Sequence, residues 1–397
     1  MNVDDFASDV LAPQQLLVCV GCGGVGKTTL AATLALEAAR RGRRALVLSI
    51  DPARRLADAL GIDSLDNTPC PLPREQLLEL GIPDGGSLSA VMLDMKRTFD
   101  GLVERFAESP EARDRILGNA IYQNVSEALS GSVEYSAMEK VYELWETGEH
   151  DLIVVDTPPA QHALDFLDAP QRLIDFLESR IVQVLIHPAF AASRFGFRVF
   201  QQGTRRVIQV LERVSGLSFL EDVSEFLLAF EGMSAGFRQR ARDVRRLLLG
   251  PQSRFVLVTG ASRVSLRQAR ELQARLQENG VALAGVLANR MHRWPDGQQA
   301  PPPAGALGTE ADISALAAAL VASEGADFPG HEAARAAVAA ATDYAALVHR
   351  DARATEELRQ AARSDGSFWA GVPELPEAVH ELAGLARIAD EIFGARR

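Results

Sequence analysis

The sequence predicts an α/β fold, in which a mostly parallel β-sheet is flanked by helices and carries an inserted α-helical subdomain. Apolar runs at 16–20, 45–50 and 152–155 alternate with helical segments, as they do in parallel sheets. Residues 170–250 show no clear strand, because their apolar side chains recur at helical spacing. We therefore expect a single domain over residues 1–397. Its core segments are about 14–62, 150–168 and 252–395. Its helical subdomain is expected at about 95–148 and 170–250.

The residues after the first apolar run match the pattern G-x-x-x-x-G-K-[ST]. They read Gly21-Cys22-Gly23-Gly24-Val25-Gly26-Lys27-Thr28-Thr29. A strand, a glycine loop and a helix N-terminus in this order place backbone N–H groups around phosphate oxygens. Lys27 would then reach the β- and γ-phosphates, and the Thr28 hydroxyl would hold Mg²⁺. The pattern favours the P-loop NTPase fold over its alternative, a glycine-rich turn.

Two aspartates follow other predicted strands. Asp51 comes directly after the run 45–50, at the sheet edge where open α/β sheets bind ligands. Asp156 ends the run 152–155, which is the Walker B position, where an aspartate holds Mg²⁺ through water. Pro158 and His162 lie in the loop that follows, near the expected γ-phosphate. The alternatives are a strand-ending turn at Asp51 and a structural role for His162.

The C-terminal half returns to the sheet. Strands are expected at 255–258 and 283–288, and Asn289 closes the second, where its amide could bind a base or form a turn. Alanine-rich helices should fill 310–362. Further predicted elements are a loop over 63–85, a strand near 88–93, a helix over 95–106, two helices within 115–145 that break near Gly131, a strand near 368–372 before Pro373, and a helix over about 380–394.

Composition limits the class of function. The formal net charge is −12 and the pI is near 5.2, which argues against general nucleic-acid binding. Three cysteines are too few for a disulfide framework and agree with a reducing cytoplasm. The acidic N-terminus lacks the apolar segment of a signal peptide, and no apolar run approaches the roughly 18 residues of a membrane span. We expect a cytoplasmic protein with no integral membrane segment.

One helical region is rich in aromatic residues. Eight of the 17 phenylalanines fall between Phe190 and Phe237. They could form the core of the helical subdomain, or an exposed apolar groove for a client protein or a membrane surface. We favour the core, because a sequence does not show exposure. The Met-rich composition expected of a promiscuous groove is also missing.

Three ordered motifs resemble those of the ArsA-type ATPases. These belong to the deviant Walker A group, with the tail-anchored-protein targeting ATPases, MinD and the nitrogenase iron protein. The family patterns are K-G-G-x-G-K-[ST], D-P-A-x-x-L-x-D and D-T-[AP]-P-x-x-H. The matching residues begin at Cys22, Asp51 and Asp156, and run to Thr28, Asp58 and His162. Segments 134–140 and 163–170 resemble a bacterial single-unit branch.

This resemblance implies an Mg²⁺-dependent ATPase that works as a dimer with facing nucleotides. Asp51 corresponds to the switch I aspartate that orients water, and Asp156 to the switch II magnesium aspartate, with Pro158 and His162 in the same switch. Thr28, Asp51 and Asp156 together would form the metal site, and Lys27 and Asp51 the catalytic pair. Asn289 corresponds to the asparagine that contacts adenine, and the loop from Pro373 would close the base pocket.

Position 22 departs from the family pattern. Cys22 stands where the family has a signature lysine that reaches across the dimer to the opposite nucleotide. Lys27, Lys96 and Lys140 are the only lysines beside 38 arginines, so no other lysine stands in a phosphate loop. We therefore expect a dimer with a related, lysine-bearing subunit, and a homodimer remains the alternative. There are two further alternatives. An arginine could substitute for the signature lysine, or a Cys22 thiolate at the helix N-terminus could serve as a redox sensor.

The prediction for function is a cytoplasmic ATPase that binds and hydrolyses Mg·ATP as a nucleotide-gated dimer. Two other classes remain open. One is a catalytically weak regulatory or structural subunit that binds ATP, and turnover by the isolated chain would separate it from the first. The other is a targeting factor for hydrophobic client proteins, which capture of apolar helices would reveal. The motifs do not identify the client, the pathway or any transported ion.

Overall fold

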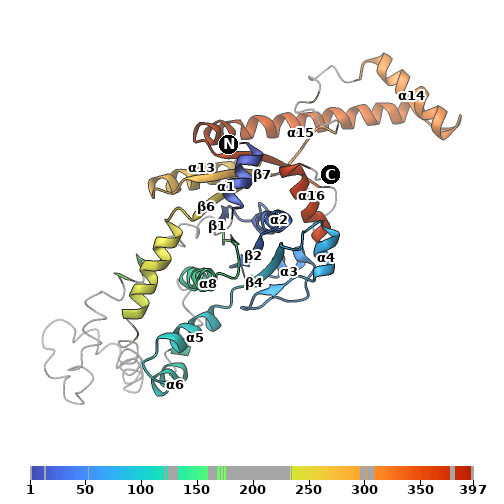
Figure 1. Ribbon diagram of the computed structural model, residues 1–397. Helices are drawn as coiled ribbons and strands as arrows, with labels where there is room; N and C mark the ends of the chain where they lie inside the picture. Colours follow the sequence, from blue (N-terminus) through green and yellow to red (C-terminus); the bar gives the residue numbers. More distant parts are fainter. Residues whose placement is uncertain are drawn as a thin grey trace, which may run out of the picture.

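The molecule is built around an eight-stranded β-sheet, as the computed structural model shows (Figure 1). The strand order is β3-β4-β2-β5-β1-β6-β7-β8, and all neighbours are parallel except β3 and β4. This confirms the predicted α/β class with a mostly parallel sheet. The strands are β1 (Gln15–Gly21), β2 (Arg44–Ser49), β3 (Cys70–Pro71), β4 (Ser87–Met92), β5 (Leu152–Asp156), β6 (Ser253–Gly260), β7 (Leu283–Met291) and β8 (Phe368–Pro373).

The structure describes most of the chain. The described residues are 2–12, 15–51, 53–119, 122–123, 133–159, 168–169, 171–172, 174–175, 233, 235–295, 301, 308–375 and 381–394. His162 lies outside them, as does the phenylalanine-rich region apart from its last member, Phe237. Phe237 is buried and its ring lies 5.6 Å from that of Phe106.

Helices cover both faces of the sheet (Figure 1). On β1, Leu17 and Cys19 face one layer of helices, while Leu16 and Val18 face the other. A strand that is buried on both faces needs an unbroken apolar run, which explains the sequence at 16–20. The helices are α1 (Val3–Val10), α2 (Lys27–Arg40), α3 (Arg55–Leu60), α4 (Arg74–Glu79), α5 (Met95–Phe106), α6 (Pro110–Gly118), α8 (Val133–Thr147), α13 (Arg263–Glu278), α14 (Glu310–Glu324), α15 (Gly330–Ser364) and α16 (Leu382–Phe393).

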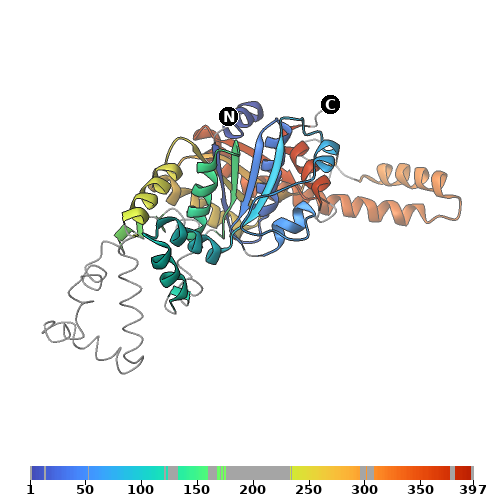
Figure 2. The same ribbon diagram turned by 60° about the horizontal axis from the view of Figure 1, so that its bottom comes forward.

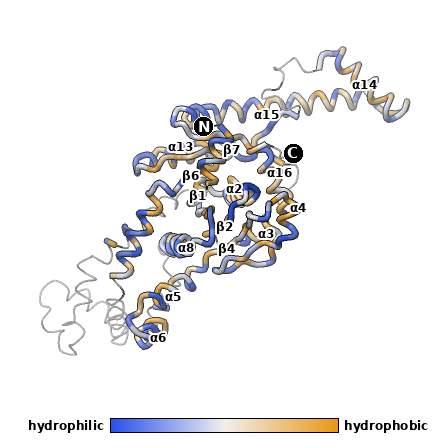
Figure 3. The backbone as a smooth tube through the Cα atoms, in the orientation of Figure 1, coloured by the Kyte–Doolittle hydropathy of each residue, from blue (hydrophilic) through white to orange (hydrophobic). Residues whose placement is uncertain are grey.

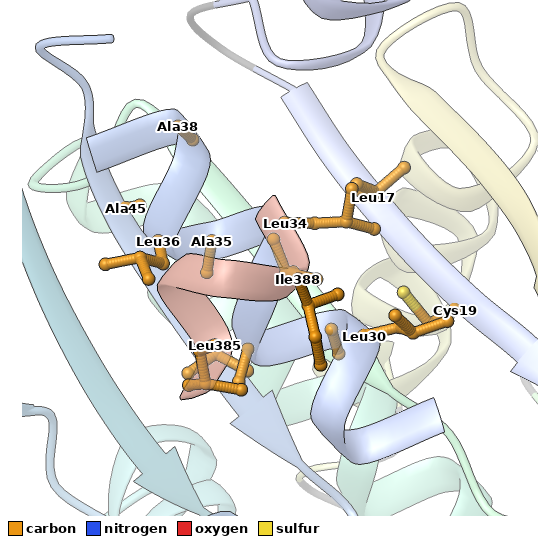
Figure 4. Close-up of a cluster of buried hydrophobic side chains, with 14 of the residues drawn as sticks. Leu17, Cys19, Leu30, Leu34, Ala35, Leu36, Ala38, Ala45, Leu385 and Ile388 are labelled. Atoms are coloured by element: carbon orange, nitrogen blue, oxygen red, sulfur yellow. The ribbon is translucent and has the colours of Figure 1, made fainter. Parts of the chain in front are cut away.

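Helix α2 is almost entirely enclosed, between the sheet and α16 (Figure 4). Leu30 and Leu34 are fully buried and pack in the same cluster as Leu385 and Ile388 of α16. Alanines fill the rest of the helix because its neighbours approach from nearly every side. Truncation of a fully buried leucine here would cost about 2–5 kcal/mol. The helix that begins at Lys27 is therefore held rigidly.

A helical hairpin of α14 and α15 extends away from the sheet (Figure 2). Thr309 and Asp312 form a capping box that starts α14. The two helices pack through a small apolar cluster centred on Ile313, Ala317 and Ala334. Hydrophobic and hydrophilic residues are otherwise mixed along both helices (Figure 3). The alanine-rich helices expected over 310–362 are thus present as one long, largely exposed hairpin.

Three local features differ from the sequence-based expectations. Helix α1 was not predicted, although Asn2 and Asp5 form a capping box at its start and Phe6 stacks on Phe368 at 4.3 Å. The expected loop over 63–85 contains β3 and α4, which are too short to give a periodic pattern. Asn289 does not close its strand, because β7 continues to Met291.

Within the described ranges, none of the helices has both the length and the apolar composition needed to cross a membrane.

Candidate functional site

The glycine loop joins β1 to α2 at the carboxyl edge of the sheet, as the sequence predicts. Two positions demand glycine. A Cβ at residue 21 would lie 2.1 Å from the carbonyl oxygen of Val258 in β6. Gly26 is the N-cap of α2 with a φ of +91°, and a Cβ there would lie 2.2 Å from Asn289 Nδ2. The loop therefore follows a path that side chains at these two positions would block.

Lys27 is the first residue of α2 and its side chain is buried, with 7% exposed. The ammonium Nζ donates a hydrogen bond to the carbonyl oxygen of Cys22 at 2.8 Å, so the side chain folds back over the loop. Burial lowers the pKa of Lys27, and the nearby charge of Asp156 partly opposes that change. A buried ammonium that contacts the backbone of a glycine-rich loop is an arrangement suited to a bound anion.

Asp156, the last residue of β5, contacts the first turn of α2 and the end of β2. Its Oδ2 accepts hydrogen bonds from the Thr28 hydroxyl at 2.6 Å and from the Ser49 hydroxyl at 3.1 Å. The register of the sheet explains the contacts, since Asp156 of β5 pairs with Cys19 of β1 and with Ser49 of β2. Ser49 was missed by the sequence analysis, because a single serine at the end of an apolar run gives no signal.

The environment of Asp156 fits a hard metal ion. Burial raises the pKa of this carboxyl to about 6, against the lowering effects of its hydroxyl partners and of Lys27. Its second oxygen, Oδ1, is buried and has no hydrogen-bond partner among the described residues. A carboxylate oxygen left unpaired beside the Thr28 hydroxyl matches the oxygen donors that Mg²⁺ prefers. The donor set therefore fits a magnesium ion.

Asp51 lies at the same edge but is turned outward. Its Oδ1 accepts a hydrogen bond from the backbone N–H of Ala53 at 3.0 Å, and its Oδ2 lies 3.4 Å from Arg55 Nη1. Its side chain is 30% exposed. Its charge contributes to the raised pKa of Asp156, so the two carboxylates interact without a direct contact in the structure. Of the three expected metal ligands, Thr28 and Asp156 are in contact, and Asp51 stands apart with Arg55.

Asn289 contacts the phosphate loop itself. Its Nδ2 donates to the carbonyl oxygen of Val25 at 2.8 Å, and the residue is buried. The amide thus fastens β7 to the loop in this conformation, and a contact with a base stays a prediction. Pro373 ends β8 opposite Met291, on the neighbouring strand.

The segment after Asp156 is tied to β1. The Thr157 hydroxyl donates to the carbonyl oxygen of Cys19 at 2.7 Å. Pro158 follows and is half-buried, and Pro159 would lie 3.8 Å from a Cβ at Gly23. The start of the predicted switch loop therefore passes over the glycine loop, while the rest of it, with His162, lies outside the described residues.

Cys22 is buried against α13. It is 3% exposed, and its Sγ lies 3.6 Å from the carbonyl oxygen of Ser265 in the first turn of that helix. Burial raises the pKa of the thiol, with Lys27 acting in the opposite direction. A raised pKa and a closed environment disfavour the reactive thiolate that a redox sensor needs. The side chain at position 22 points toward a neighbouring helix of the same chain.

Sequence similarity links most of the chain to one protein family. The profile of the family described as anion-transporting ATPase, ArsA_ATPase, matches residues 14–301. The chain is 25% identical over 285 residues to "ATPase GET3" of Malassezia globosa, covering 71% of this chain and 74% of that protein. It is 24% identical over 283 residues to "Putative arsenical pump-driving ATPase 2" of Aquifex aeolicus, covering 68% and 78%. An uncharacterized Streptomyces coelicolor protein, SCO2128, is 33% identical over 179 residues, which are 45% of this chain and 41% of that one.

Proposed function

Because the chain belongs to the ArsA family of anion-transporting ATPases, we propose that it binds Mg·ATP at the loop from Gly21 to Thr29 and hydrolyses it between two subunits. The ATPase activity follows from the family, which confirms the resemblance seen in the motifs. The contact between Thr28 and Asp156 beside the buried Lys27 carries the assignment of the site, because it joins a phosphate loop to a metal-binding carboxylate. The deviant Walker A type, the single-unit branch and a cytoplasmic location belong to the same proposal.

The proposed chemistry is attack of water on the γ-phosphate. Backbone N–H groups of the loop and the Lys27 ammonium hold the phosphates, with Lys27 exchanging the Cys22 carbonyl for a phosphate oxygen. Thr28 and Asp156 would hold the Mg²⁺, and Ser49 orients the Asp156 carboxylate. When bound, Mg²⁺ neutralises charge on the β- and γ-phosphates. Asp51 orients the water once its carboxylate leaves Arg55.

The test of the site is Lys27→Ala, with ATP affinity measured by calorimetry on folded protein. We expect affinity to fall about tenfold or more, since a charge-assisted contact to phosphate is lost. Lys96→Ala is the control, because Lys96 pairs with Asp100 on α5. Unchanged ATP affinity in folded Lys27→Ala protein would show that the phosphates bind elsewhere.

The absence of the signature lysine supports a second part of the proposal, that the partner is a related subunit which carries it. A homodimer would lack this cation at both sites, and a cation supplied in trans is worth about 10³–10⁵ in rate in related systems. In the mixed dimer, the partner's lysine would reach the nucleotide that this chain holds. A homodimer in which an arginine serves instead is the competing arrangement.

Turnover assays separate these arrangements. We expect weak hydrolysis by the chain alone, a gain on addition of a lysine-bearing paralogue from the same genome, and a smaller gain from Cys22→Lys. The gain from substitution is small because position 22 is closed against Ser265 of α13. Robust Mg²⁺-dependent hydrolysis by the wild-type chain alone, unaffected by the paralogue, would overturn this part.

Two alternatives follow from particular observations. A weak regulatory or structural ATP-binding subunit is favoured by the outward position of Asp51 together with Cys22. Such a subunit would bind ATP normally but would not hydrolyse it, either alone or with any paralogue. A targeting factor for hydrophobic clients would bind apolar helices in an ATP-dependent way, and the phenylalanine-rich region from Phe190 to Phe237 motivates that assay.

A further inference from the structure

A large cleft opens beside the phosphate loop, on the side of α13 and α15. Its volume is about 1240 Å³, and Gly24, Val25 and Asn289 form part of its wall. Ligand pockets typically measure about 300–1,000 Å³, so the space exceeds what a single phosphate ion needs. We call this space the arginine cleft, because six arginines line it. They are Arg263, Arg267, Arg270, Arg290, Arg350 and Arg353.

Arginines outnumber carboxylates among the residues that line the arginine cleft. The lining contains only two carboxylates, Asp351 and Glu357, against six arginines, although the whole chain has a net charge of −12. Glu357 pairs with Arg270, and Asp351 pairs with Arg350 at 2.8 Å. The other four arginines have no ion pair with a carboxylate among the described residues. Unpaired guanidinium groups that share a concave wall repel each other, and an anion would relieve that repulsion.

Five of the six arginines come from two neighbouring helices, α13 and α15. Arg263, Arg267 and Arg270 are spaced so that they share one face of α13. Gln273 of α13 donates to Asp365 at the end of α15 at 3.3 Å, which holds the two helices side by side. The first turn of α13 contacts the phosphate loop through Ser265, so the cleft begins at the loop and runs outward between the helices.

Arg290 adds an independent observation. It follows Asn289 on β7 and has a φ of +55°, and among the described residues no other non-glycine residue has a positive φ. A side chain in this region of backbone space costs about 1 kcal/mol or more, and such strain persists mostly at functional sites. The strained residue is exposed, lines the cleft and forms no ion pair among the described residues. Arg290 is therefore the fourth arginine of the cleft lining without an ion pair among the described residues.

We propose that the arginine cleft binds an oligophosphate anion, at a site that adjoins the phosphate loop and is distinct from it. The planar fork of a guanidinium binds phosphate oxygens in pairs, and the four unpaired arginines carry more positive charge than one carboxylate would neutralise. The contact with Gly24 and Val25 places the anion next to the nucleotide. The oligophosphate is supplied either by a free phosphorylated small molecule or by the nucleotide of a facing subunit. An acidic peptide is the competing occupant.

The experiment uses the full-length Lys27→Ala chain, in which the phosphate loop is disabled, and inorganic tripolyphosphate in the absence of metal. We expect calorimetry to show one bound anion per chain. Arg263→Gln with Arg267→Gln should weaken binding at least tenfold, because two charge-assisted contacts are lost. Arg275→Gln is the matched control, since Arg275 is exposed on α13 and lies outside the cleft lining. The wild-type chain saturated with ADP gives the same test without a change in the loop.

Three results would overturn the proposal. They are no binding to either protein, equal binding by the double variant and the control, or preference for polyglutamate over tripolyphosphate.

The two sources of the anion are separated by light scattering with a non-hydrolysable ATP analogue. If the double variant loses analogue-dependent dimerisation, the facing nucleotide is the ligand, and if dimerisation is unchanged while tripolyphosphate binding falls, the ligand is a free small molecule. Because these titrations avoid the phosphate loop, their failure is distinguishable from failure of the proposed ATP site.

Discussion

Replacement of Asp156 by asparagine should stabilise the metal-free protein at alkaline pH. The folded state holds the pKa of this carboxyl at about 6, above its ordinary value of 3.8, because the group is buried. A raised pKa means that folding favours the protonated form, so the stability contributed by that proton is lost as pH rises between about 4 and 6. A shift of about two units corresponds to about 3 kcal/mol. Asparagine keeps an oxygen for Thr28 and Ser49 and carries no charge.

The assay is urea unfolding of wild type and Asp156→Asn at pH 5, 6, 7 and 8, with EDTA present. The variant's advantage should reach about half its full value near pH 5 and level off near 3 kcal/mol above pH 7. With Mg²⁺ and ATP the order should reverse, because only the wild type retains the carboxylate oxygen that is unpaired in the structure. A variant that is less stable than the wild type at pH 8 in EDTA would refute the reasoning.

Three further predictions concern the loop, the switch and the helical layer. Asp51→Asn should lower turnover more than ATP affinity, since a residue that orients water acts mainly in the transition state, and matched losses on one preparation would make it a binding residue. Gly26→Ala should abolish ATP binding measured by calorimetry, because its Cβ would strike an amide 2.2 Å away, whereas Gly61→Ala, at a φ of +67° with open space around it, should bind ATP normally. Arg240→Gln should lower the free energy of unfolding in urea by about 3 kcal/mol, since it removes the cation that pairs with the buried Glu139 carboxylate at 2.7 Å, and a loss below about 1 kcal/mol would contradict this.

The sequence alone was sufficient for those parts of the site that depend on local pattern. Gly21 to Thr29 is a contiguous motif. Asp51 lies just beyond an apolar strand and Asp156 is the last residue of another, so both are expected at the carboxyl edge of the sheet. The β-sheet could be predicted for the same reason, because both of its faces are buried and its strands form unbroken apolar runs.

Contacts between distant residues could not be predicted. Ser49 reaches Asp156 only because β2 lies next to β5, and the order of strands is not written in either segment. The contact of Cys22 with Ser265 spans 243 positions and that of Asn289 with Val25 spans 264. The arginine cleft was invisible for the same reason, since its residues come from segments that only the fold brings together. Helix α1 could have been found from its capping box.

The long helix α15 has a mechanical consequence. Its C-terminal half is fixed to the body of the molecule by Asp351, which is fully buried and accepts hydrogen bonds from both the backbone N–H and the ring of His292. The part of the helix before Tyr344, whose hydroxyl donates to the carbonyl oxygen of Arg293, therefore projects as a rigid segment of roughly 20 Å, at 1.5 Å per residue. A rotation of about 10° about that contact would carry the far end through roughly 4 Å. His292 lies three residues after Asn289, which contacts the phosphate loop. A small movement of the loop would therefore pass through His292 to α15 and become a larger displacement at the far end of that helix.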